Sequence, residues 1–223
     1  MAPAVGISYA MICGSGSAGL VWEPVASVLG GRVLQAPDET TVPAMAAALR
    51  PEIERLARPR VVIGSSLGAL IALDLACAVP IDALILAAAG FGIAISPTVL
   101  DTIAANAPGM LDRMARGVVA DPDDHAIVEA VARDFEARGP RLLLRHMQAL
   151  ARHRPKPPRD LPPTFVLWGT RDPGVPLKDH AELAVRCDAP LLPIAAAGHL
   201  PYFEQPGATL RWIRAAVGWA GLS

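Results

Sequence analysis

The chain has 223 residues, enough for one domain with room for an insertion. Hydrophobic residues make up 52% of the sequence and charged residues 18%, a balance that excludes a disordered chain. Twenty Lys and Arg side chains are offset by 21 Asp and Glu side chains, so the formal net charge is −1. Because no basic surplus exists to neutralise phosphates, we expect no nucleic-acid partner.

The three cysteines, Cys13, Cys77 and Cys187, form no CxxC motif, and an odd number cannot all pair within one chain. We therefore expect free thiols and a reducing, cytoplasmic location. No apolar run reaches the ~18 residues of a membrane-spanning helix, so we expect no membrane partner. The apolar run before Gly14 is similar to the core of a secretory signal, but its basic start is missing, because the first basic residue is Arg32. We expect a buried first strand there instead.

Six short apolar stretches predict the strands of a sheet. The central ones are apolar without alternation, which is typical of parallel strands covered on both faces. The predicted strands cover residues 7–13, 32–35, 60–64, 83–88, 164–169 and 191–194.

Helical patterns separate these strands. One apolar stripe runs through Trp22, Val25 and Leu29, and another follows residues 41–56, where Pro51 should kink or split the helix. Residues 66–79 are apolar nearly all round and predict a central buried helix. This alternation predicts an α/β fold with a mostly parallel six-stranded sheet flanked by helices.

Residues 91–160 interrupt the alternation. They contain no strand-like run, but apolar residues recur at helical spacing over 127–135 and 143–150. The dipeptides at 121–122 (Asp-Pro) and 139–140 (Gly-Pro) are predicted helix starts. We predict a helical cap at residues 91–160, inserted into a core formed by residues 1–90 and 161–223.

The motif G-x-S-x-G is centred on Ser66, between an apolar strand that ends at Gly64 and an apolar helix. A strand that turns sharply into a helix needs small residues two positions before and after the serine, here Gly64 and Gly68. This context favours a nucleophilic serine over a glycine-rich turn without chemistry. Ser65 does not fit, because Ile63 and Leu67 flank it at those positions.

A serine hydroxyl needs a base, usually a histidine held by a carboxylate. His199 follows the last predicted strand, and Asp172 follows the strand before it, so both should lie at the carboxyl edge of the sheet, where such folds bind ligands. Asp188 precedes its strand and should lie at the other edge. A solvated loop histidine and a turn aspartate are the simpler alternatives.

Two backbone N–H groups should stabilise the oxyanion that forms in the transition state. One is the amide after the nucleophile, that of Leu67. The other should come from the glycine-rich loop after the first strand, residues 13–17.

The chain resembles the α/β-hydrolase family over nearly its whole length, and the cap-bearing esterases, including the pimeloyl-ester carboxylesterases, are similar in size. The resemblance lies in the elbow around Ser66 and in the glycine loop after the first strand, with Trp22 on the next helix. It lies also in the segment Gly169-Thr170-Arg171-Asp172 and in Gly198-His199, followed by Pro201 and Glu204-Gln205-Pro206. It implies an α/β-hydrolase fold with Ser66 as nucleophile, Asp172 as acid and His199 as base, and with oxyanion amides from Ser15 and Leu67.

Two features depart from the family pattern. Cys13 stands where the family commonly has a histidine before the oxyanion residue, and a buried thiol cannot replace the hydrogen bonds of that histidine. The usual N-terminal strand pair is also absent, so we expect the sheet to be shortened to six strands.

The glycine loop also permits a competing interpretation. Residues 14–19 spell G-x-G-x-x-G, and Asp38 follows 19 residues later, as in a dinucleotide-binding fingerprint. That fingerprint requires its last glycine inside the opening helix, whereas Pro24 indicates that the helix begins near Glu23. We therefore disfavour a dinucleotide site.

These observations predict a serine hydrolase that cleaves a carboxylic ester of an apolar acyl group through an acyl-enzyme on Ser66. A thioesterase or lactonase with the same triad is the first alternative, and a ligand-binding protein without turnover is the second. The chemistry needs no cofactor, and no metal site is expected, because His146 and His153 have no third ligand nearby. An Arg cluster at residues 141–154 permits a carrier protein as partner. The identity of the acyl group and the oligomeric state stay open.

Overall fold

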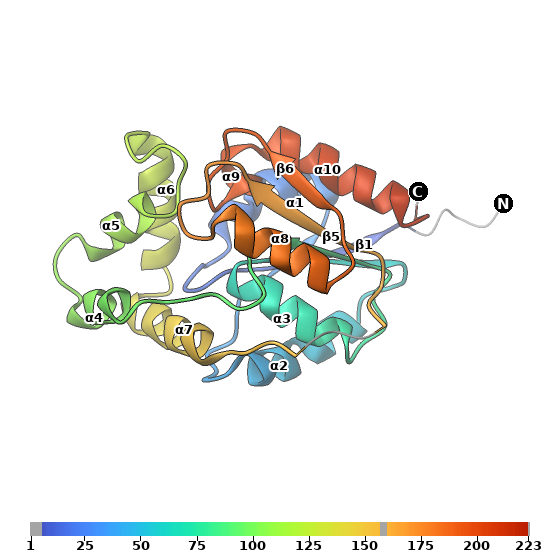
Figure 1. Ribbon diagram of the computed structural model, residues 1–223, viewed down its shortest axis with the longest axis horizontal. Helices are drawn as coiled ribbons and strands as arrows, with labels where there is room; N and C mark the ends of the chain where they lie inside the picture. The colour runs from blue at the N-terminus through green and yellow to red at the C-terminus, as the bar shows by residue number, and fades with distance from the viewer. Residues whose placement is uncertain (1–5, 157–159, 223) are drawn as a thin grey trace.

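The computed structural model describes residues 6–156 and 160–222 (Figure 1). Residues 1–5, at the start of the predicted core, and 157–159, at the end of the predicted cap, lie outside this range. Within it, six strands form one parallel sheet, as the sequence predicts, and their order is β2-β1-β3-β4-β5-β6. The strands are β1 (Ser8–Ile12), β2 (Arg32–Leu34), β3 (Arg60–Ser65), β4 (Ala83–Ala87), β5 (Thr164–Gly169) and β6 (Leu191–Ile194).

The helices of the described residues follow in chain order. They are the 3₁₀ turn η1 (Leu20–Trp22), α1 (Glu23–Leu29), α2 (Val42–Glu54), α3 (Leu67–Ala76), α4 (Pro97–Ala105), α5 (Met110–Arg116), α6 (His125–Glu136), α7 (Pro140–Arg152), α8 (Leu177–Arg186), α9 (Pro201–Glu204) and α10 (Pro206–Trp219).

The central strands are buried because helices cover both faces of the sheet. Every residue of β4 is buried, as are all residues of β3 after Arg60, which explains their unbroken apolar sequences. One core layer joins the sheet to α2, α3 and α8, and the other joins it to α1, α9 and α10. In the second layer, the rings of Trp22 and Tyr202 stack with their centroids 3.6 Å apart.

Two local predictions need correction. Pro51 does not split α2, because Met45, Leu49 and Ile53 on its inner face pack into the core on both sides of the proline. Helix α6 does not begin at the Asp-Pro pair 121–122. Its N-cap is Asp124, whose carboxylate accepts the N–H of Ile127 at 3.1 Å. The other predicted start is confirmed, since α7 begins at Pro140.

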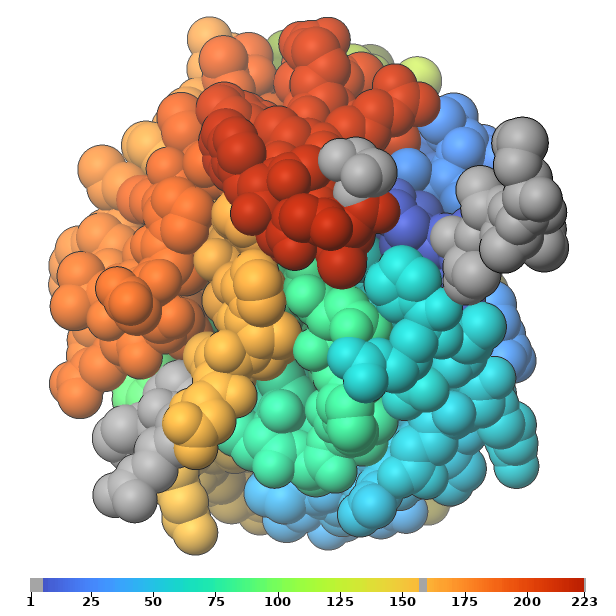
Figure 2. Space-filling model, turned by 90° about the vertical axis from the view of Figure 1, so that its right-hand side faces the viewer, coloured from blue at the N-terminus to red at the C-terminus, as the bar shows by residue number. Residues whose placement is uncertain are grey.

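Helices α4 to α7, which we call the inserted helices, all lie between β4 and β5 in the described chain. Figure 1 shows them together beyond the carboxyl ends of the strands, with the C-terminus at the opposite end of the molecule. Figure 2 views that opposite end, where α10 lies beside the segments that precede the central strands. No described helix is long and apolar enough to cross a bilayer.

Candidate active site

Ser66 occupies a strained turn between β3 and α3. Its backbone angles are φ 55° and ψ −119°, a conformation that an L-residue adopts only where the surrounding structure enforces it. A Cβ on Gly64 would lie 2.6 Å from the Cα of Ala69, and a Cβ on Gly68 would lie 2.6 Å from the carbonyl oxygen of Cys13. The two glycines of the motif are therefore required, because β3, α3 and β1 meet here without space for a side chain.

The structure places His199 and Asp172 in direct contact. The Nδ1 atom of His199 lies 2.9 Å and 3.0 Å from the two carboxylate oxygens of Asp172. An ionised carboxylate can only accept hydrogen bonds, so Nδ1 must carry the proton and donate it to Asp172. The Nε2 atom of His199 consequently holds a lone pair and can act as a base.

Asp172 keeps its charge although its side chain is fully buried. Burial raises the pKa of the carboxyl, but the charge of His199 and hydrogen bonds from His199 and two backbone amides outweigh burial and lower it overall. These amides, from Gly174 and Val175, both donate to Oδ1, at 2.8 and 3.0 Å. The site therefore holds a carboxylate that orients His199 without taking its proton.

A second histidine lies behind this pair. His180 of α8 is fully buried, and its Nε2 atom lies 3.8 Å from Oδ2 of Asp172. Its Nδ1 atom lies 3.2 Å from the carbonyl oxygen of Pro176, which can only accept, so Nδ1 carries the proton of the neutral ring. Burial lowers the pKa of His180, so it stays neutral near pH 7 and leaves the carboxylate to His199.

The loop after β1 lies over the serine. Its first glycine approaches Ser66 so closely that a Cβ on Gly14 would contact the Cβ of Ser66 at 3.4 Å. Ser15 follows, and its buried hydroxyl has no hydrogen-bond partner within the described structure. Leu67 is the first residue of α3, and the first N–H groups of a helix have no acceptor inside it. Ser15 thus lines the same cavity as Ser66, and Leu67 directly follows Ser66 at the start of α3.

One cavity of about 380 Å³ connects these groups. Ser15, Ser66 and His199 line it, whereas the side chain of Leu67 points into the core and leaves only its backbone on this side. The rest of the lining is mostly apolar and comes largely from the segment between β4 and β5, whose helices contribute Val99, Met114, Val131, Phe135, Leu143 and Met147. Such a lining suits an apolar ligand.

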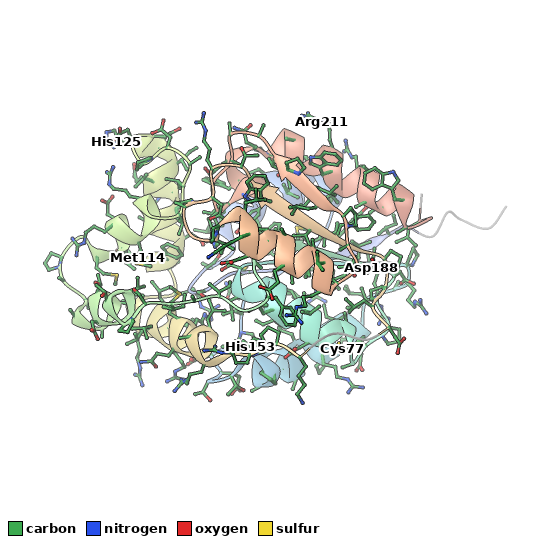
Figure 3. All side chains as sticks on the ribbon, in the orientation of Figure 1. Cys77, Met114, His125, His153, Asp188 and Arg211 are labelled. Atoms are coloured by element: carbon green, nitrogen blue, oxygen red, sulfur yellow. The ribbon has the colours of Figure 1, made fainter. Side chains whose placement is uncertain are left out.

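Figure 3 distinguishes the two edges of the sheet. Met114, which lines the cavity, lies among the inserted helices, whereas Asp188 lies beyond the far end of α8, toward the chain termini. Asp188 therefore belongs to the edge opposite the cavity, as its position before β6 indicates.

Glu204, which belongs to the segments that carry the family resemblance, has a role in holding the histidine loop that the sequence did not predict. Its carboxylate accepts N–H groups from Gly198 (3.1 Å), Leu200 (3.0 Å) and Ala120 (2.7 Å). These bonds, with a bond from the His199 N–H to the carbonyl of Val118 at 2.8 Å, fasten the histidine loop to the segment before α6. A carboxylate at the end of the short helix α9 gives no sequence signal of this role, because its partners are backbone amides.

Cys13 is a buried apolar side chain. It is fully buried, and burial raises the pKa of its thiol to about 12, so it is not a nucleophile at neutral pH. Its thiol hydrogen-bonds the side chain of Ser17, in the loop after β1, but a thiol is only a weak donor and acceptor.

The structure disfavours the dinucleotide interpretation. Helix α1 begins at Glu23, after the last glycine of the loop, so that glycine does not lie inside the helix. Asp38 forms an ion pair with Arg145 at 2.8 Å and is exposed, away from the cavity lining. Across the described ranges, no group of three His, Cys, Asp or Glu side chains is arranged to hold a metal ion.

Comparisons with known proteins agree with this geometry. A profile of the family described as "Alpha/beta hydrolase family" matches residues 11–212, whereas no curated protein matches the chain. Among solved structures, a thermophilic esterase is 21% identical, with 97% of this chain and 90% of that chain covered and a TM-score of 0.86.

Two other solved structures share the fold. The enol-lactonase from Burkholderia xenovorans LB400 is 18% identical, with 96% of this chain and 92% of that chain covered and a TM-score of 0.80. The type II thioesterase BorB from the borrelidin biosynthetic cluster is 20% identical, with 96% and 93% covered and a TM-score of 0.70. At these identities, the similarity establishes the fold and leaves the substrate open.

Proposed function

Because the chain belongs to the alpha/beta hydrolase family, we propose that it is a serine hydrolase that cleaves a carboxylic ester of an apolar acyl group. The observation that carries the proposal is the His199–Asp172 pair, with His199 and Ser66 lining the same mostly apolar cavity. Nothing in this chemistry calls for a cofactor. The buried thiols of Cys13 and Cys187 are the ground for proposing the cytoplasm as its location.

In the first half-reaction, the Ser66 oxygen attacks the ester carbonyl carbon while Nε2 of His199 takes the hydroxyl proton. The carbonyl π electrons move to oxygen, and the amides of Ser15 and Leu67 donate hydrogen bonds to the resulting oxyanion. When the intermediate collapses, the carbon–oxygen bond to the alcohol breaks, and the alcohol takes the proton from Nε2. Ser66 is then esterified with the acyl group.

In the second half-reaction, water replaces the alcohol. His199 takes a proton from the water as its oxygen attacks the acyl-enzyme, then returns a proton to the Ser66 oxygen as that oxygen leaves. Asp172 stabilises the imidazolium that forms in each half, and its two backbone amide donors hold it in position. The products are the carboxylic acid and the free enzyme.

A thioester or lactone would react at the same groups, and solved structures of a thioesterase and an enol-lactonase share the fold. The Arg cluster gives less support to a carrier-protein substrate than its sequence suggests, because Arg145 is paired with Asp38, and Arg152 and Arg154 donate to backbone carbonyls of α7. We therefore rank a free ester above a carrier-bound thioester. A protein that only binds ligands has no need of the oriented histidine.

The test is labelling and turnover in the same preparation. A fluorophosphonate probe should label wild type and S65A, whereas S66A should remain unlabelled. The values of kcat/KM for a panel of p-nitrophenyl esters, an acyl-CoA thioester and a γ-lactone are then compared. We expect the p-nitrophenyl esters to have the highest values. Wild type that neither binds the probe covalently nor turns over any substrate would overturn the proposal and favour the ligand-binding alternative.

A further inference from the structure

Two side chains of the inserted helices hold the loop that is proposed to supply an oxyanion amide. His146 of α7 is 1% exposed, and its Nδ1 atom accepts the backbone N–H of Gly16 at 3.0 Å. On the other side of the ring, Nε2 lies 2.9 Å from the carbonyl oxygen of Pro37. The imidazole thus bridges the loop after β1 and the segment after β2.

These two bonds fix the protonation state of His146. The carbonyl of Pro37 can only accept, so Nε2 carries the proton. The Gly16 N–H can only donate, so Nδ1 must be unprotonated. The ring is therefore neutral, with one tautomer matched to both partners. A protonated ring would point a second N–H at the Gly16 amide and break the bridge.

The bond to Gly16 controls the peptide beside Ser15. Residues 14–17 form a turn that is closed by a bond from the Ser17 N–H to the Gly14 carbonyl at 3.4 Å, and Gly16 has φ 67° at its third position. Positive φ at that position is typical of a type II turn, in which the central peptide is flipped relative to type I. The N–H that His146 binds belongs to that central peptide, between Ser15 and Gly16. His146 therefore selects the orientation of the peptide adjoining the Ser15 amide.

Asp134 of α6 holds the remainder of the same loop. It is 1% exposed, and its Oδ1 atom accepts the N–H of Leu20 at 2.7 Å, at the start of η1. The hydroxyl of Ser17 and the amides of Ala18 and Val21 also hydrogen-bond this carboxyl. A buried carboxyl with this many donors is engaged by the loop, so it does not serve as a ligand for substrate.

We infer that His146 and Asp134 are positioning residues that keep the Ser15 amide aimed at the oxyanion, in place of the histidine that Cys13 replaces. The inference rests on the proposed hydrolase function. It ties the inserted helices to catalysis, because any movement that withdraws α6 and α7 also releases the oxyanion loop.

Two variants of His146 separate its two bonds. In H146N, the amide oxygen takes the place of Nδ1 and keeps an acceptor for Gly16, but loses Pro37. In H146Q, the amide nitrogen takes the place of Nε2 and keeps a donor for Pro37, but loses Gly16. Both variants bury one unmatched backbone group, so a purely structural role of His146 would affect them equally. The readouts are kcat and KM on p-nitrophenyl butyrate, per active site titrated with a fluorophosphonate.

We expect H146Q to lose about tenfold to a hundredfold in kcat with little change in KM. This loss in kcat is no larger than the loss expected when a whole oxyanion donor is removed. The kcat of H146N should stay within about threefold of the wild-type value, because this variant keeps the acceptor for Gly16. The second pair is D134N, which keeps an acceptor for Leu20, and D134L, which does not. D134L should lose kcat, and D134N should retain most of it. This pair decides the matter if the His146 variants fail to fold.

The outcomes distinguish this inference from the proposed function. An inert wild type would overturn the proposed function and this inference with it. An active wild type, with H146Q equal to H146N and D134L equal to D134N in kcat per titrated site, would overturn the inference alone.

Discussion

Replacing Asp172 with asparagine should abolish the base function of His199 while leaving the fold intact. Both backbone donors of this loop, the amides of Gly174 and Val175, point at Oδ1. In D172N they require the amide oxygen at that position, because an NH₂ group there would oppose two N–H donors. The NH₂ group must then face Nδ1 of His199. That nitrogen becomes an acceptor, so the imidazole proton moves to Nε2, which can no longer accept the Ser66 proton.

The expected loss is about 10⁴-fold in kcat, or about 5.4 kcal/mol of transition-state stabilisation at 1.36 kcal/mol per factor of ten. Binding should be affected little, because Asp172 does not line the cavity. The assay is steady-state hydrolysis of p-nitrophenyl butyrate at pH 8, with urea denaturation to confirm that the variant is folded.

D188N is the matched control. Asp188 is exposed and has φ 48°, a left-handed conformation that asparagine tolerates equally well, and it lies at the other edge of the sheet. Its kcat should equal that of wild type. If D172N retained more than about a tenth of wild-type kcat, the tautomer argument would be refuted, because a histidine with Nε2 protonated offers no base.

Three further predictions follow from packing and titration. G68A should lower the free energy of unfolding by about 1–3 kcal/mol in urea, whereas G207A, with open space in α10, should not lower it; equal effects would contradict the packing argument. M147A should move the preferred acyl chain of p-nitrophenyl esters to longer lengths, with kcat/KM rising about fourfold per buried CH₂ until the cavity ends; an unchanged optimum would place the acyl group elsewhere. Burial lowers the pKa of His146 and His180, so their neutral forms contribute fully to the free energy of unfolding above about pH 6.5. As the pH falls below that value, the free energy of unfolding should fall by up to about 1.4 kcal/mol per pH unit for each histidine. In H146N, a plot of the free energy of unfolding against pH should be less steep between about pH 7 and 5.

The fold and the positions of Ser66, Asp172 and His199 could be predicted because short sequence patterns indicate them. Buried parallel strands are apolar without interruption, and a serine between two glycines at the end of such a strand has few structural alternatives. His199 and Asp172 could be placed because each follows a strand, and the carboxyl ends of parallel strands share one edge. Their contact, at 2.9 Å, was inferred from that topology and from chain order alone.

The groups that hold the loops gave no such signal. Glu204, Asp134 and His146 each bind a backbone N–H, and the partners lie 84, 114 and 130 residues away in the sequence. A backbone amide has no residue identity, so no spacing or motif marks the pair. Even a local prediction failed in this way: the Asp121 carboxylate bonds the N–H of Asp123 at 2.9 Å, which makes a turn where a helix start was expected.

The positions of Asp134 and His146 suggest how the site tolerates Cys13. In the expected arrangement, a histidine within the oxyanion loop would hold that loop from the core. Here the core side contributes a buried thiol with a weak hydrogen bond to Ser17, and the bonds to Gly16 and Leu20 come from α7 and α6. The same helices contribute Val131, Phe135, Leu143, Met147 and Leu150 to the apolar lining. Substrate that packs against them therefore stabilises the conformation in which the Ser15 amide is aligned, which couples acyl-group recognition to oxyanion stabilisation.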